Sequence, residues 1–259
     1  MPPLNSTGKK FFTGKFYFRG RPVEDGPSYG MTLKAAGSMR FRWNERNVNR
    51  ENFLAELAGI ERRTVAVELI HSQNVFAVDS PDELELMQGD GIITVNRELV
   101  PVVTVADCMP IFIFDPVTGV FGTLHSGWKG TGIVGNAIRL AEKKYGSRPE
   151  DFCVVMGPHI HECCYLVDEE RAKYFRVNFT PDCVEEEKTG GYRLSLARAN
   201  LSVLREIGVD EDSIVSYSDC TCCNPLFGSF RRETANLAPG MDMEERQRHF
   251  TVQAAWVRW

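Results

Sequence analysis

Two histidines and one cysteine each stand at the end of an apolar, strand-like run of the sequence. They are His71 after residues 65–70, Cys108 after residues 102–106 and His125 after residues 120–124. Two imidazoles and one thiolate can bind zinc and leave a fourth position open for water or substrate. That arrangement is typical of catalytic zinc sites, so these residue types indicate an enzyme.

The spacing of the three residues is too long for a short local motif, so a shared site would require the fold to bring them together. Cys108 lies 37 residues after His71, and His125 lies 17 residues after Cys108. These intervals are much longer than those of zinc fingers, so no finger is expected. A single histidine or cysteine is more often an ordinary core or surface residue. From spacing alone, a metal site and a structural role both stay open.

Asp107 stands directly before the thiol of Cys108. Its carboxylate could orient His71 or His125, or it could carry a proton during a reaction. The alternative is a turn-forming aspartate between two strands.

Two further segments have the composition of an anion site. The glycine-rich stretch 127–132 leads into a predicted helix, and its amides together with Lys129 would suit phosphate. Arg231 and Arg232 follow residues 227–230 and could clamp an anion as well. Ordinary structural roles, as a strand-to-helix turn and a solvated strand end, stay open for both segments.

The other histidines and cysteines have no evident partners in the sequence. Cys220, Cys222 and Cys223 have a spacing that resembles metal-binding motifs, but no His or Cys pair lies nearby along the chain. His159 and His161 are also possible ligands. We expect a structural or pocket-lining role for both groups.

The composition argues against several partners. The 259 residues are 43% hydrophobic and 25% charged, which is typical of a globular protein. A net charge of −5 leaves no electrostatic footprint for nucleic acid or an anionic membrane, so we expect neither as a partner. No apolar run approaches the roughly 20 residues that span a bilayer. Residues 1–6 lack the apolar stretch of a signal peptide, so the eight cysteines predict reduced thiols and a cytoplasmic protein.

Alternating hydrophobic runs predict an α+β fold: a single domain, residues 1–259, of layered mixed β-sheets flanked by helices. No linker, repeat or low-complexity tract divides the chain. The helices are expected at residues 49–57, 131–145, 169–177 and 195–207. The strands are expected at residues 11–18, 64–70, 91–95, 100–105, 111–114, 120–124, 152–156, near 214, 227–230 and 251–259.

Short motifs along most of the chain resemble those of the YfiH-type family with a laccase-like domain. Members of this family were long described as multicopper polyphenol oxidases and later as purine nucleoside phosphorylases. The matching motifs are His71-Ser72-Gln73, Ala106-Asp107-Cys108-Met109-Pro110, Asp115-Pro116, His125-Ser126-Gly127-Trp128-Lys129-Gly130, Gly157-Pro158, Cys163-Cys164-Tyr165, Ala199-Asn200, Cys220-Thr221 and Phe230-Arg231-Arg232. They fall in order over roughly residues 11–232.

The resemblance implies one α+β domain with zinc held by His71, Cys108 and His125. It also implies phosphate-dependent cleavage of adenosine, inosine and methylthioadenosine, together with deamination of adenosine. Asp107, Cys108 and His125 are then the expected catalytic residues. The expected substrate-binding residues are Gln73, Lys129, Arg231 and Arg232, and the substrates are a purine nucleoside and phosphate.

Two other functions stay open at this stage. Two histidines and one cysteine are also the ligands of a blue-copper centre, so copper-dependent oxidation of phenols is an alternative. The five histidines of the chain argue against a conventional multicopper enzyme. Alternatively, Cys108 is a nucleophile and His125 its base in a metal-free amidase or deamidase. The sequence fixes neither the preferred substrate nor the oligomeric state.

Overall fold

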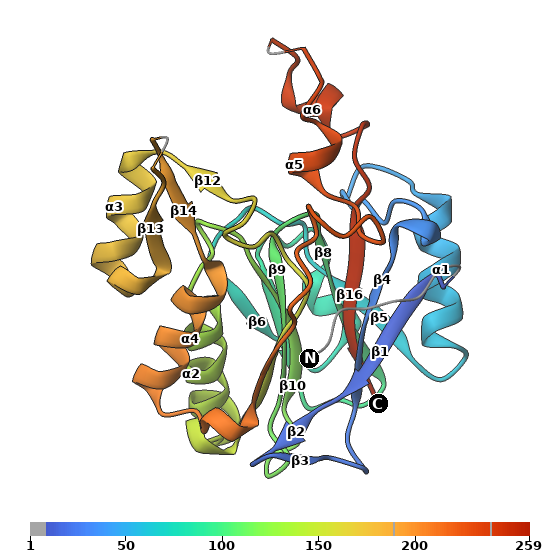
Figure 1. Ribbon diagram of the computed structural model, residues 1–259. Helices are drawn as coiled ribbons and strands as arrows, with labels where there is room; N and C mark the ends of the chain where they lie inside the picture. Colours follow the sequence, from blue (N-terminus) through green and yellow to red (C-terminus); the bar gives the residue numbers. More distant parts are fainter. Residues whose placement is uncertain (1–8, 189, 239) are drawn as a thin grey trace.

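Two β-sheets lie face to face and form the centre of the molecule (Figure 1). The computed structural model describes residues 9–188, 190–238 and 240–259. Residues 1–6, on which the expected lack of a signal peptide rests, lie outside the described residues. Within the described ranges, no helix is both long and apolar enough to cross a membrane.

The first sheet has five strands and the second has six, and both are mixed. The five-stranded sheet has the order β1 (Phe11–Lys15), β4 (Ser28–Thr32), β16 (Gln253–Arg258), β8 (Leu99–Val105) and β5 (Arg63–Ala66). The six-stranded sheet has the order β15 (Ile214–Ser216), β11 (Cys153–Met156), β9 (Met109–Phe114), β10 (Phe121–Ser126), β7 (Gly91–Thr94) and β6 (Val75–Ala77). The pairs β5–β8, β6–β7 and β11–β15 are parallel, whereas the other pairs in these two sheets are antiparallel.

Helices cover the outer faces of the two sheets. α2 (Ile133–Tyr145) and α4 (Leu196–Ile207) lie on the six-stranded sheet, and α1 (Val48–Ala58) lies on the five-stranded sheet (Figure 1). The α+β class predicted from the sequence is therefore confirmed.

The smaller elements are set around this frame. A three-stranded sheet of β12 (Leu166–Val167), β14 (Tyr192–Leu194) and β13 (Val184–Glu186) packs with α3 (Glu169–Asn178), and β2 (Tyr17–Phe18) pairs with β3 (Arg21–Pro22). The remaining short helices are η1 (Lys34–Ala36), η2 (Pro81–Leu84), η3 (Pro149–Asp151), η4 (Pro181–Cys183), η5 (Glu211–Ser213), α5 (Phe230–Glu233) and α6 (Met243–Arg246).

Aromatic side chains fill the space between the two sheets. Tyr29 of β4 stacks on Phe112 of β9 with ring centroids 4.9 Å apart, and both residues are fully buried. Every residue of β9 and of β10 is buried, as expected for strands that are covered on both faces. This rigid pair of strands carries the chemistry-bearing residues at one end.

Two local predictions from the sequence were wrong. Residues 227–230 do not form a strand: Ser229 accepts a hydrogen bond from the backbone N–H of Arg232 and starts α5 there. The glycine-rich passage around Gly30 belongs to strand β4, which was missed. A Cβ on Gly30 would lie 2.4 Å from the ring of Trp256, its partner in β16, so the indole occupies the space a side chain would need.

Candidate metal centre

His71, Cys108 and His125 come together at one end of the sheets. Among the described residues, each offers one ligand atom, and these atoms all lie within 4.8 Å of one another. His71 lies in the loop after β5, Cys108 in the turn between β8 and β9, and His125 within the end of β10. His125 stands opposite Pro110 across the β9–β10 pair, which brings it next to the turn that carries Cys108.

The backbone around these three residues is unusual. His71 has φ of 60° and Asp107 has φ of 80°, a left-handed conformation that is uncommon outside glycine. Gly127 lies against all three donors, and a Cβ there would be 3.0 Å from the Cys108 sulfur and 3.4 Å from the His71 ring. A Cβ at this position would press on the Cys108 sulfur, so glycine suits this close approach of the backbone to the three donors.

A buried aspartate that the sequence analysis missed fixes both histidines. Asp90 accepts a 2.8 Å hydrogen bond from Nδ1 of His125 and a 3.0 Å bond from the backbone N–H of His71. It also accepts a hydrogen bond from the backbone N–H of Ser72 at 2.6 Å and one from the Ser72 hydroxyl at 2.7 Å. A carboxylate that holds Nδ1–H leaves Nε2 of His125 as the metal-binding atom. The orienting role predicted for Asp107 therefore falls to Asp90.

The charges at the site favour an anionic sulfur. Burial raises the pKa of the Cys108 thiol, but the facing His125 and His71 imidazoles outweigh burial and lower this pKa to about 6. Burial lowers the pKa of His125, but Cys108 and Asp90 outweigh it and raise this pKa to about 10. Without a metal, Cys108 and His125 therefore form a thiolate–imidazolium pair.

These donors fit a single zinc ion. One thiolate and two imidazole nitrogens are zinc ligands, and three protein ligands leave the fourth corner open. The sulfur is already anionic, and one imidazole already has its second nitrogen held by a carboxylate. Both features are usual where histidine and cysteine bind zinc.

A cavity of 420 Å³ opens directly beside the three donors. This volume is within the usual range for sites that bind small molecules. All three predicted ligands line the cavity, together with Asp107. Its aromatic lining residues are Phe41, Trp128, Tyr165, Phe230 and Phe250, and its arginines are Arg40, Arg42, Arg171 and Arg231. The site therefore combines flat apolar walls with positive charge.

Two of the four arginines are free of a carboxylate partner. Arg40 and Arg42 form ion pairs with Glu45 and Glu68. In the described part of the chain, no carboxylate pairs with Arg171, whose Nε is buried and has no hydrogen-bond partner. The Arg171 guanidinium lies 4.3 Å from the centre of the Trp128 ring.

Arg231 likewise forms no ion pair with a carboxylate among the described residues. It lies near Tyr165, as Arg171 does. Its guanidinium lies 5.8 Å from the centre of the Tyr165 ring, and its Nη2 donates to the carbonyl of Leu166. Burial raises the pKa of Tyr165 to about 12, although Arg171 and Arg231 oppose this rise. The hydroxyl therefore stays protonated at neutral pH and can donate a hydrogen bond.

Asp107 connects two loops instead of contacting either imidazole. It accepts hydrogen bonds from the Thr221 hydroxyl at 2.6 Å, the Ser229 hydroxyl at 3.0 Å and the backbone N–H of Arg231 at 2.7 Å. These bonds hold the start of α5, and with it Arg231, against the turn that carries Cys108.

Three predicted substrate-binding residues lie outside the described lining of the cavity. The Gln73 amide donates to the Thr131 carbonyl and accepts from Asn136, so it holds the start of α2. Arg232 donates to the carbonyls of Thr221, Cys222, Asn224 and Phe227 and clamps that loop. The polar groups of both side chains are therefore used in hydrogen bonds within the protein.

Lys129 is the third of these residues. It is exposed, and its ammonium lies 5.3 Å from the centre of the Trp128 ring. Arg171 lies closer to the same ring and does line the cavity. Nothing in the sequence distinguished Arg171, on helix α3, from the other surface cations.

Two of the remaining histidines and four of the remaining cysteines gather in two neighbouring groups, joined by a hydrogen bond from the His161 N–H to the Cys220 sulfur. His159 and His161 lie with ring centroids 4.4 Å apart, and burial lowers the pKa of both rings. Cys220 and Cys223 do have a partner pair, contrary to the sequence analysis: Cys163 and Cys164 lie beside them. We refer to Cys163, Cys164, Cys220 and Cys223 as the thiol cluster.

Comparisons with known proteins give this geometry a context. Residues 42–240 match the family model described as multi-copper polyphenol oxidoreductase laccase. Purine nucleoside phosphorylase YlmD of Geobacillus stearothermophilus is 31% identical over 241 residues, which cover 83% of this chain and 88% of the relative. Adenosine deaminase RL5 of an unknown prokaryotic organism is 30% identical over 162 residues, which cover 60% of this chain and 62% of that protein.

A solved structure has the same fold over nearly the whole length of the chain. The crystal structure of YlmD from Geobacillus stearothermophilus matches with a TM-score of 0.78 and 25% sequence identity. The match covers 98% of this chain and 97% of that one.

Proposed function

Because the chain belongs to the family described as multi-copper polyphenol oxidoreductase laccase, and its relatives include enzymes named for purine nucleosides, we propose that it is a zinc-dependent purine nucleoside phosphorylase. Its proposed substrates are adenosine, inosine and methylthioadenosine. Deamination of adenosine is the proposed second reaction, in line with the relative named adenosine deaminase. The observation that carries the proposal is the meeting of His71, Cys108 and His125 beside a cavity with arginine and aromatic walls.

The cavity suits the two halves of the proposed reaction. A purine is flat and apolar on its faces, so Phe41, Phe230 and Phe250 provide surfaces on which it can pack. Phosphate is a compact anion, and among the described residues Arg171 and Arg231 are the two cavity arginines that form no ion pair with a carboxylate. We assign the phosphate to these two guanidiniums because arginine binds phosphate oxygens with two parallel hydrogen bonds.

In phosphorolysis, a phosphate oxygen forms a bond to C1′ of the ribose while the bond from C1′ to the purine nitrogen breaks. The electron pair of that bond leaves with the purine, which must take up a proton. Arg171 and Arg231 would hold the phosphate for attack, and the Tyr165 hydroxyl beside them would donate a hydrogen bond to the substrate. Holding both reactants in one cavity removes much of the entropic barrier.

The three donors would bind zinc, and the metal would supply Lewis-acid activation of a substrate or a water at its open position. Asp90 keeps the His125 imidazole in its metal-binding orientation. Deamination replaces the amino group at C6 of the purine with oxygen and releases ammonia. Asp107 lines the same cavity and is our proposed proton carrier for this step.

Product analysis tests the proposal. Purified protein is incubated with adenosine, inosine or methylthioadenosine, with and without phosphate. Free base, ammonia and the sugar 1-phosphate (ribose 1-phosphate, or its 5-methylthio form from methylthioadenosine) are measured. We expect base and sugar phosphate in equal amounts, both dependent on phosphate. Release of base without phosphate, or turnover that is unchanged in the Cys108→Ala variant, would contradict the proposal.

Assays on the same purified protein also test the two alternative functions, phenol oxidation and metal-free amide hydrolysis. Oxidation of a phenol by copper-loaded protein, with no nucleoside cleavage, would favour the polyphenol oxidase. Activity on amides that survives chelation but not thiol alkylation would favour Cys108 as a nucleophile with His125 as its base.

A further inference from the structure

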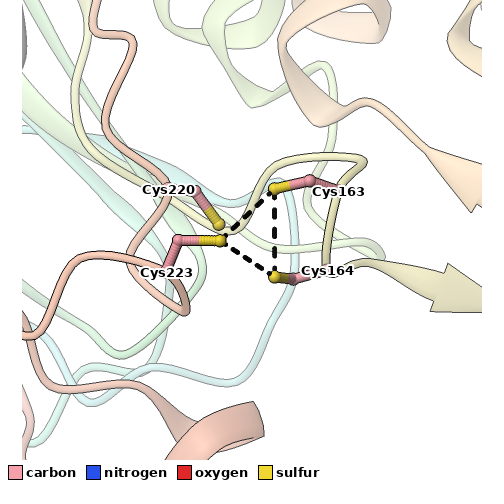
Figure 2. A group of neighbouring side chains, drawn as sticks. All are labelled: Cys163, Cys164, Cys220 and Cys223. Carbon is pink, nitrogen blue, oxygen red and sulfur yellow. Dashed lines mark hydrogen bonds between the residues drawn. The ribbon is translucent and has the colours of Figure 1, made fainter.

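Four thiols lie close together at a second place in the fold, away from the cavity lining. Figure 2 shows the sulfur atoms of the thiol cluster turned toward one another. The sulfur of Cys163 lies 3.8 Å from that of Cys164 and 3.7 Å from that of Cys223, and Cys164 and Cys223 are 3.3 Å apart. The Cys220 sulfur lies within 4.8 Å of the other three.

The fold itself brings the two pairs together. β11 and β15 are parallel neighbours in the six-stranded sheet, so the chain leaves both strands at the same edge. Cys163 and Cys164 lie in the turn after β11, and Cys220 and Cys223 lie in the turn after β15. A β-bridge between His159 and Cys220 continues the pairing up to the cluster.

The distances match a single tetrahedral ion better than other uses of four cysteines. With zinc–sulfur bonds of about 2.3 Å, the sulfurs of a tetrahedral site lie about 3.8 Å apart. A disulfide needs sulfurs about 2 Å apart, and all eight cysteines are free. A cluster of several irons would hold its thiolates farther apart than this group allows.

We propose that the thiol cluster binds one zinc ion through its four cysteines. The Cys-x-x-Cys interval between Cys220 and Cys223 is a usual spacing for zinc ligands in a turn. Four thiolates fill the coordination shell and leave no corner for substrate, so this ion has a structural role. Each thiol gives up its proton to solvent when it binds. The site is separate from the proposed active site and does not depend on the function proposed above.

Polar groups around the cluster suit its charge. Four thiolates and one zinc ion carry a net charge of −2, and two guanidiniums hold the loops that bear them. Arg193 donates to the carbonyl of Cys163, and Arg232 donates to the carbonyls of Thr221 and Cys222. The backbone N–H of His161 donates to the Cys220 sulfur at 3.4 Å, as amides do around structural thiolates.

The ion would stabilise one wall of the active-site cavity. Tyr165 follows Cys164 directly and lines the cavity. Thr221 follows Cys220 and donates its hydroxyl to Asp107, the residue before Cys108. Zinc bound by the thiol cluster therefore ties together the two loops that hold Tyr165 and Asp107 in place.

Zinc content per chain tests the proposal in variants that separate the two sites. His71→Ala/Cys108→Ala protein keeps the thiol cluster and is expected to hold about one zinc ion, with only sulfur neighbours in X-ray absorption. Cys163→Ser/Cys223→Ser protein is expected to lose about one zinc ion relative to the wild type. Cys183→Ser is the matched control, because its hydroxyl can replace the thiol that donates to the Thr180 carbonyl. We expect its zinc content to be unchanged.

The proposal is overturned if the His71→Ala/Cys108→Ala protein takes up no zinc, or if nitrogen or oxygen neighbours dominate its zinc spectrum. Should Cys163→Ser/Cys223→Ser fail to fold, alkylation of the wild type gives the answer by mass spectrometry. We expect the four thiols to be protected until a chelator is added. Equal labelling with and without chelator, or the mass of an intramolecular disulfide, would count against the site.

Discussion

Among the described residues, two groups of His and Cys side chains could hold a metal ion, and the two groups differ in their donors and in their surroundings. His71, Cys108 and His125 provide three donors beside a cavity, and a buried carboxylate orients one of them. The thiol cluster provides four donors near the surface, and two of its cysteines are exposed. Three donors with an open corner suit catalysis, whereas four donors suit a structural role.

The comparison also shows how the same fold serves both sites. The three-donor site lies where β5 and β8 of one sheet end and where β9 begins and β10 ends in the other, whereas the thiol cluster lies after β11 and β15. In both places ordered strands support side chains that must keep their geometry. Asp107 links them, because it is adjacent to Cys108 and accepts the hydroxyl of Thr221 beside Cys220.

Removing the thiolate of the three-donor site should abolish the proposed reaction. We expect Cys108→Ala to lower phosphate-dependent cleavage of inosine by roughly 10³-fold or more, because metal activation contributes several kcal/mol and each 1.4 kcal/mol is tenfold. Steady-state rates with saturating phosphate measure the loss. The Cys183→Ser variant should keep the wild-type rate, and equal rates for the two variants would show that Cys108 is not required.

Removing two ligands of the thiol cluster should affect stability first. If free zinc exceeds the dissociation constant a thousandfold, the ion stabilises the fold by about 4 kcal/mol. We expect Cys163→Ser/Cys223→Ser to lower the melting temperature by roughly 10 °C. Calorimetry with and without a chelator measures this. The chelator should lower the melting temperature less in the variant than in the wild type, because the variant keeps only the three-donor site from which zinc can be removed. A melting temperature equal to that of the wild type would argue against a structural ion.

Neutralising Asp90, the carboxylate that holds His125, should weaken zinc binding at the three-donor site without abolishing it. Asp90→Asn replaces an acceptor of four hydrogen bonds with an amide, so we expect zinc affinity and turnover to fall roughly 10–100-fold. Asp115→Asn changes another buried turn aspartate, away from the cavity, and serves as the control. Equal zinc affinities in the two variants would show that Asp90 does not support the metal site.

Replacing either arginine that we assign to phosphate should weaken the binding of phosphate but not of the nucleoside. Arg171→Met or Arg231→Met should raise KM for phosphate roughly tenfold and leave KM for inosine nearly unchanged, because a charged hydrogen bond contributes about 1.5–3 kcal/mol. Lys129→Met should change neither constant, since Lys129 is exposed. If Lys129→Met has the larger effect, phosphate binds at Lys129 and not at the two cavity arginines.

The sequence predicted the three-donor site because each ligand directly follows a recognisable apolar run. It did not reveal Asp90, whose bond to His125 spans 35 positions and depends on how deeply β7 is buried. The only local sign was its place between two glycines, Gly89 and Gly91. A carboxylate is normally exposed, so only the fold shows that this one faces inward.

The thiol cluster escaped the sequence analysis for a topological reason. Cys163 and Cys223 are 60 positions apart, and they meet only because β11 and β15 are parallel neighbours. Strand order within a mixed sheet cannot be read from hydrophobic periodicity. The same limit applies to strand β4: its Gly30 pairs with Trp256 of β16, which is far away along the chain, and the indole fills the space that a side chain would need.

The central claim is that His71, Cys108 and His125 hold the zinc ion on which nucleoside cleavage depends. Its most direct test follows phosphate-dependent hypoxanthine release from inosine while metal-stripped protein is titrated with zinc. We predict almost no turnover at the start, a rise that saturates with zinc, and no rise at any zinc concentration in Cys108→Ala. Full turnover by the stripped wild type, or a normal response of the variant, would contradict the claim.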